Sequence, residues 1–84
     1  MAEFLAELYV SRANESGVRH AAEALGASVR CVRSIFVPDD EICFLLFEAA
    51  SVGDVVEAAR TAGLAFERIS EVATPAEPTI VTDA

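Results

Sequence analysis

Apolar and polar side chains alternate at the start of the chain. The segment 3–11 presents one wholly apolar set of side chains, namely Phe4, Ala6, Leu8 and Val10. The alternate set places the carboxylate of Glu7 between two larger side chains, Leu5 and Tyr9. A period of two is typical of a β-strand that buries one face. We therefore predict a strand over 3–11 whose apolar set packs against a core.

Two later segments repeat apolar residues with the spacing of an amphipathic helix. The first, 15–25, has the stripe Val18, Ala21, Ala22 and Leu25, and the second, which follows Ser51, has Val52, Val55, Val56, Ala59 and Ala62. Asn14 and Ser51 stand at N-cap positions, and Asp54 gives the second helix a capping-box-like Ser-x-x-Asp. Gly26 and Gly63 stand where helix C-caps favour glycine.

Two apolar segments, 29–37 and 42–48, flank the turn-forming sequence at 38–41 and predict a β-hairpin. A turn centred on Asp39 and Asp40 pairs Val37 with Ile42, Phe36 with Cys43, Ile35 with Phe44, Ser34 with Leu45, Arg33 with Leu46, Val32 with Phe47 and Cys31 with Glu48. Opposed residues share a face. The set under the helices is then Val32, Ser34, Phe36, Cys43, Leu45 and Phe47. The other face carries Cys31, Arg33, Ile35, Val37, Ile42, Phe44, Leu46 and Glu48.

A final strand is predicted over 66–72. The order β-α-β-β-α-β predicts an α+β fold, a ferredoxin-like sandwich. Its four-stranded antiparallel sheet has the strand order 4-1-3-2, with both helices on one face. Residues 1–73 form this domain. Pro75 and Pro78 favour a flexible C-terminal tail over 74–84, with an edge-pairing strand at 79–82 as the alternative.

Composition suggests a second buried surface. A domain of 84 residues buries only about 60–65% of the surface of its unfolded chain, yet 54% of the residues are hydrophobic. The mean hydropathy is +0.41. We expect the face of the sheet turned away from the helices to be covered in a homodimer or higher homo-oligomer.

The formal charge of −8, from 6 basic and 14 acidic residues, opposes binding to nucleic acid or to an anionic membrane. No apolar run approaches the ~18–20 residues that span a bilayer. The acidic start lacks the pattern of a signal peptide, so we expect a cytoplasmic protein with Cys31 and Cys43 as reduced thiols.

Four side chains on the uncovered sheet face are candidate ligand-binding residues, namely Glu7, Tyr9, Arg33 and Glu48. They would line a cavity between subunits, and the alternative is a structural Arg–Glu ion pair at the subunit interface. Glu7 and Glu48 could also act as an acid/base pair, although no catalytic motif such as a phosphate loop or H-E-x-x-H is present. His20 and Cys31 are weak candidate metal ligands.

The chain resembles a family of small bacterial ferredoxin-like domains of unknown function, which includes a nickel-binding type from actinomycetes. The resemblance covers residues 3–72 and is carried by the segments 4–7, 29–38, 43–49, 62–64 and 66–69, together with Ser51. It implies assembly through the sheet and the binding of a small ligand or of a divalent metal such as nickel. A guanidinium cannot ligate a metal, so Arg33 favours an anionic or carboxylate ligand instead.

Three functions follow as hypotheses. The first is a non-enzymatic ligand- or metal-binding homodimer. The second is an enzyme of the dimeric α+β-barrel kind, a small monooxygenase or isomerase that uses the same cavity. The third is a structural or regulatory interaction module. The mass of the intact assembly, with any ligand or metal that it retains, would discriminate among them.

Overall fold

The computed structural model describes residues 2–26 and 28–73, in which strands and helices alternate as the sequence pattern predicts. The elements, in chain order, are β1 (Ala2–Tyr9), a short 3-10 helix η1 (Arg12–Asn14), α1 (Glu15–Glu23), β2 (Val29–Val37), β3 (Ile42–Ala49), α2 (Val52–Ala62) and β4 (Arg68–Val72). The predicted tail at 74–84, including the alternative strand at 79–82, lies outside the described residues.

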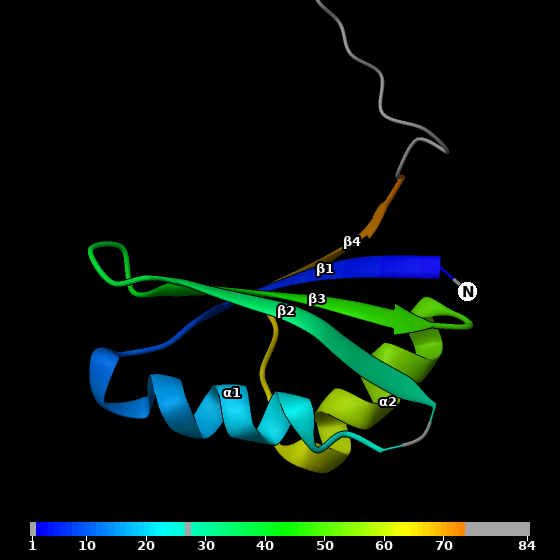
Figure 1. Cartoon of the computed structure of the whole chain (residues 1–84), viewed down its shortest axis with the longest axis horizontal. Helices are drawn as coiled ribbons and strands as arrows, with labels where there is room; N and C mark the ends of the chain where they lie inside the picture. Colours follow the sequence, from blue (N-terminus) through cyan, green and yellow to red (C-terminus); the bar gives the residue numbers. More distant parts are fainter. Residues whose placement is uncertain (1, 27, 74–84) are drawn as a thin grey trace, which may run out of the picture.

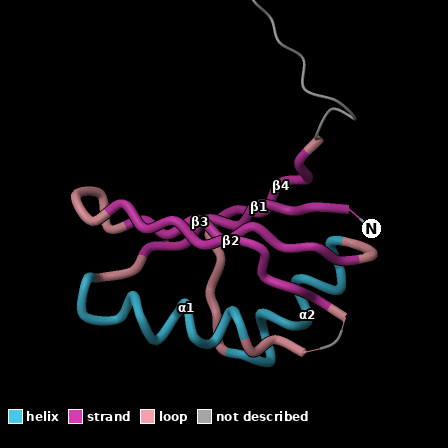
Figure 2. Tube along the Cα trace, in the orientation of Figure 1, coloured by secondary structure: helices cyan, strands magenta, loops and turns pink. Residues whose placement is uncertain are grey.

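The four strands form one antiparallel sheet in the order β2-β3-β1-β4. Figure 1 shows both helices on the same side of this sheet, and Figure 2 shows the two layers edge-on. The α+β class and the predicted strand order, which is the same order read from the other edge, are therefore confirmed. The arrangement is compatible with the predicted ferredoxin-like sandwich.

The two helices differ in how their ends are held. Ser51 Oγ accepts a hydrogen bond from the backbone N–H of Asp54 at 3.3 Å, and Gly63 closes α2 with a left-handed φ of 77°. Asn14 occupies the N-cap position of α1, but its side chain makes no capping hydrogen bond. The helix ends at Glu23, two residues before the predicted Leu25, because the N–H of Ala24 bonds to Ala21 in a tightened last turn.

The core lies between the sheet and the helices. Its fully or nearly fully buried side chains include Phe4, Ala6 and Leu8 of β1, Cys43, Leu45 and Phe47 of β3, Ala22 of α1 and Val55 and Ala59 of α2. The ring of Phe66, which precedes β4, lies 5.8 Å from the ring of Phe47. Burial of each large apolar side chain contributes roughly 1.5–3 kcal/mol. The predicted helix-facing sets of β1 and β3 are confirmed.

The predicted hairpin register holds from Val37–Ile42 back to Arg33–Leu46, and then a β-bulge interrupts it. Beyond the bulge, Cys31 lies opposite Phe47 and Arg30 lies opposite Glu48. Both predicted pairs in this region, Val32 with Phe47 and Cys31 with Glu48, are therefore wrong. A bulge places an extra residue in one strand, and a shift of one residue exchanges the two faces.

The bulge has two consequences for the predicted faces. Cys31 joins the helix-facing side of β2, where it is half-buried against the core, so its predicted place on the uncovered face is wrong. Val32 was predicted under the helices but is 39% exposed. Arg30, instead of Cys31, shares a face with Glu48.

Candidate ligand-binding face

The side of the sheet opposite the helices is here named the open face, and none of the described helices or strands covers it (Figure 1). The strand registers place on it the apolar residues Leu5, Tyr9, Ile35, Val37, Ile42, Phe44, Leu46 and Val72. The same registers add the polar residues Glu3, Glu7, Arg30, Arg33, Glu48, Arg68 and Ser70. Tyr9 and Ile35 are 68% and 48% exposed. All four predicted ligand-binding residues thus lie on one surface.

Within the open face, all the charged residues except Arg33 fall into two groups. One cross-strand row runs Ile35, Phe44, Glu7 and Arg68, and another runs Arg30, Glu48, Glu3 and Val72. Glu7 and Glu48 lie four positions apart along the paired strands β1 and β3. At about 3.3 Å per residue this is roughly 13 Å. The two carboxylates therefore start from separate parts of the open face, and the suggested acid/base pair stays a prediction.

Glu48 forms an ion pair, and its partner is Arg30. The distance from Arg30 Nη1 to Glu48 Oε1 is 3.4 Å, with side-chain exposures of 72% and 32%. Arg33 lies opposite Leu46, one cross-strand row away, and takes part in none of the ion pairs between residues 2–26 and 28–73. The sequence suggested an Arg–Glu pair at a subunit interface, with Arg33 as the arginine. Within the protomer, the pair is instead made by Arg30, which the bulge places opposite Glu48.

Glu7 lies between Phe44 on β3 and Arg68 on β4. The described part of the chain contains no ion pair within 4.0 Å that involves Glu7 or Arg68. The backbone is held more firmly than the side chain, because the N–H of Glu67 donates to the carbonyl oxygen of Glu7 at 2.7 Å. The carboxylate of Glu7 therefore has no ion-pair partner among the described residues, while its backbone is paired on both sides.

One protomer offers little enclosure beside Glu7. A cleft lined by Glu7, Leu8, Tyr9, Ile42 and Glu67 has a volume of about 20 Å³. Pockets that hold small molecules usually measure about 300–1,000 Å³. A ligand at this cleft would need a second wall above the open face.

The two candidate metal ligands lie apart from this surface. His20 is an exposed residue of α1, and Cys31 faces the helices. Burial raises the pKa of the Cys31 thiol, and the nearby Glu23 carboxylate raises it further. Within residues 2–26 and 28–73, no group of three or more His, Cys, Asp or Glu side chains is placed to hold a metal ion.

The sequence did not identify three charged residues of the open face, namely Glu3, Arg30 and Arg68. The segment 66–72 alternates between two sets of mixed polarity, so its pattern does not show which set faces away from the helices. The register of β4 on β1 settles this, because it places Arg68 opposite Glu7. Arg30 comes opposite Glu48 because of the bulge between Cys31 and Arg33. The sequence gives no sign of that bulge, since no glycine stands there.

A scan against models of protein families gave no match, and searches of curated proteins and of solved structures gave none either. The chemistry of the open face has to be inferred from its own residues. Of the described helices, none has the length and apolar character needed to cross a membrane.

Proposed function

We propose that the protein is a small, non-enzymatic ligand-binding protein that acts as a homo-oligomer, with the ligand held between the open face and a second copy of the chain. The distribution of charge supports this proposal most directly. The open face carries three of the 6 basic residues and three of the 14 acidic residues. It is therefore formally neutral, and the net charge of −8 belongs to the rest of the chain.

A neutral apolar face is the surface through which two strongly acidic copies can approach with least repulsion. Eight of its residues are apolar, including Phe44, Leu46 and the exposed Ile35. Covering them with a second copy removes apolar surface from water, which favours association. The same cover supplies the second wall that the small cleft beside Glu7 lacks.

The proposed ligand contacts are Glu7, Tyr9, Arg33 and Glu48. Arg33 has no ion-pair partner among the described residues, so it favours an anionic or carboxylate group on the ligand. A divalent metal such as nickel, the ligand suggested by the family resemblance, would have to draw its ligands from two copies. Native mass spectrometry of the purified protein distinguishes these possibilities, since it reports the oligomer mass together with any retained molecule or metal.

The decisive variant is Leu46→Glu, which places a charge at the centre of the open face. We expect it to remain folded by circular dichroism and to sediment as a monomer, whereas the wild type sediments as a dimer or larger. Val52→Glu is the matched control, because Val52 is a 47% exposed residue of α2 on the opposite side of the sheet. A wild-type monomer at high concentration, or equal effects of both variants, would contradict assembly through this face.

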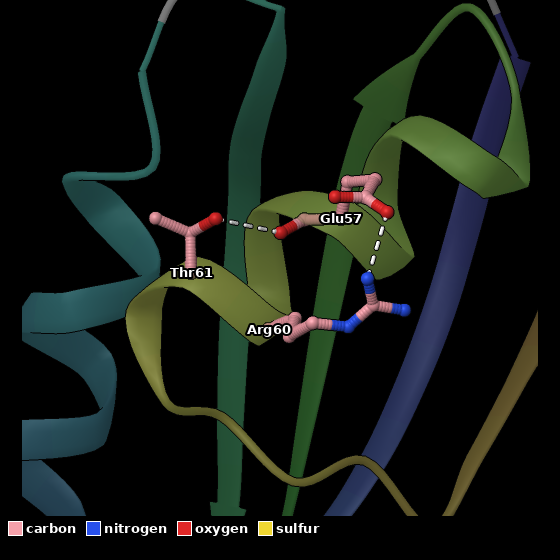
Figure 3. A network of polar contacts seen from close by, with 3 residues as sticks. All are labelled: Glu57, Arg60 and Thr61. Carbon is pink, nitrogen blue, oxygen red and sulfur yellow. Dashed lines mark hydrogen bonds and ion pairs between the residues drawn. The ribbon is translucent and has the colours of Figure 1, made fainter.

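A second pair of variants concerns arginine. Arg33→Ala should weaken association more than Arg60→Ala, because Arg60 lies on the solvent side of α2. Its guanidinium contacts Glu57 at 2.9 Å, and the Thr61 hydroxyl donates to the Glu57 carbonyl oxygen at 3.1 Å (Figure 3). Unchanged sedimentation and melting in both variants would show that Arg33 does not contribute to the interface.

A further inference from the structure

The chemical class of the ligand can be inferred from the polar residues at one end of the open face, provided that the proposed function is correct. Glu7 and Arg68 lie directly opposite each other on β1 and β4. Opposed residues in an antiparallel pair have Cα atoms about 4.5–5.5 Å apart. The carboxylate and the guanidinium nevertheless do not approach within 4.0 Å of each other. Glu7 and Arg68 thus start from opposed backbone positions, and neither has an ion-pair partner among the described residues.

The surroundings of this pair are apolar and aromatic. Phe44 lies opposite Glu7 on the other neighbouring strand, and the exposed Ile35 lies beyond it in the same row. Tyr9, 68% exposed, follows Glu7 by two positions on the same face. A ligand held by the charged pair would therefore rest its body on the apolar and aromatic side chains of this row and of Tyr9.

Covering the open face makes the two charges costly unless both are matched. A buried charged group needs an opposite charge or hydrogen bonds to replace its water. A simple carboxylate would match Arg68 and leave Glu7 unpaired, and a simple amine would do the reverse. A molecule that carries both groups on adjacent atoms matches both.

We propose that Glu7 and Arg68 bind the ammonium and carboxylate groups of an α-amino acid that has an apolar side chain. The guanidinium of Arg68 offers a planar pair of donors to the ligand carboxylate. The carboxylate of Glu7 accepts from the ligand ammonium, and Glu67, at the edge of the same cleft, adds negative charge on that side. The apolar side chain of the ligand lies over Phe44 and Tyr9.

Isothermal titration of the full chain with L-leucine and L-phenylalanine tests this inference. The matched probes are 4-methylpentanoate, which is leucine without its ammonium group, and 3-methylbutylamine, which lacks the carboxylate. We expect saturable binding of at least one of the two amino acids and binding of each analogue weaker by about tenfold or more. Equal binding of leucine and 4-methylpentanoate would overturn the inference in favour of a plain carboxylate site.

Two variants assign the roles. Glu7→Gln should weaken leucine binding by about tenfold and leave 4-methylpentanoate unchanged or tighter, and Arg68→Gln should weaken leucine and leave 3-methylbutylamine unchanged. Glu71→Gln, on the other side of β4, and Arg60→Gln are controls expected to bind leucine like the wild type. Sedimentation of each variant checks that assembly persists.

The outcomes separate this inference from the proposed function. An intact oligomer that binds neither amino acid overturns the amino-acid site and leaves the covered open face standing. A protein that binds no amino acid and does not associate overturns both.

Discussion

On β3, the two faces of the sheet carry similar apolar residues but have opposite surroundings. On β3, the helix-facing residues Cys43, Leu45 and Phe47 are completely buried, whereas Phe44 and Leu46, their neighbours in sequence, are only partly covered. Both sets consist largely of apolar side chains, so hydrophobicity alone does not distinguish them. The difference is that helices cover one face of the protomer (Figure 2). The apolar residues of the open face lack the second layer that covers the core, and this is why we propose a partner for it.

The largest expected effect comes from truncating the two phenylalanines of β3. Phe47→Ala removes a fully buried ring and should lower the free energy of unfolding by about 3–5 kcal/mol, independently of protein concentration. Phe44→Ala should cost much less in dilute protein. Its cost should grow with concentration, because in the proposed assembly the wild-type ring is covered by a second copy. Urea denaturation at several concentrations measures both effects.

A concentration-independent loss of similar size in the two variants would show that the open face is stabilised within the protomer. The proposed difference, that one face is buried in the protomer and the other only on association, would then be wrong. A negligible effect of Phe44→Ala at every concentration would instead show that no partner covers the ring.

The anchoring of the helix layer gives the next effect. Ser51→Ala removes the hydroxyl that caps α2 and should lower the free energy of unfolding by about 1 kcal/mol. Asn14→Ala, at the same position of α1, should change it little, because the Asn14 side chain makes no capping bond. Thermal denaturation of both variants provides the measurement, and equal losses would contradict the difference between the two caps.

The alternation of β1 and β3 and the turn at 38–41 were enough to predict the class, the strand order and most of the hairpin register. These features are local, since period two, helical spacing and turn residues act over a few positions. The bulge at Val32 was not predictable, because its neighbours Cys31 and Arg33 fit either register. That one-residue shift moved Cys31 off the open face and brought Arg30 to Glu48.

The candidate site was predictable only in part for the same reason. Glu7 and Tyr9 followed from the pattern of β1 alone. The opposition of Arg68 to Glu7 depends on how two strands distant in sequence pair, and nothing in the mixed alternation of 66–72 specifies that register. Contacts between such strands are decided by packing of the whole sheet.

The helix-facing side of the sheet should also shield its two thiols, Cys31 and Cys43, from solvent. Burial raises the pKa of Cys43, and the Glu15 carboxylate raises it further. The folded pKa therefore lies above the ordinary value of 9.0, so ionisation favours the unfolded chain. The contribution of the neutral Cys43 thiol to the free energy of unfolding is fully present below pH 9.0, and it is lost as the pH rises above that value. Melting temperatures from neutral to alkaline pH should show this fall, and Cys43→Ala should make it shallower.

Chemical modification provides an independent check on the same face. A thiol reagent should modify the half-buried Cys31 first and reach Cys43 only as fast as the protein opens. Equal rates for the two thiols in folded protein would show that the helix layer does not exclude solvent as the structure indicates.

The smallest expected effect concerns the ion pair that the bulge creates. Arg30 is largely exposed, and exposed ion pairs typically contribute about 0–1 kcal/mol, so Arg30→Ala should change the unfolding of dilute protein by less than about 0.5 kcal/mol. In the assembled protein the same substitution would leave the Glu48 carboxylate covered and without its partner, which is costly. The effect of Arg30→Ala on association, measured by sedimentation, should therefore exceed its effect on folding.

Adding Glu48→Gln to the Arg30→Ala variant should restore part of the lost association, because it removes the unpaired charge. A loss of association that Glu48→Gln does not relieve would mean that Glu48 remains in solvent, and that the cover does not extend to this end of the sheet.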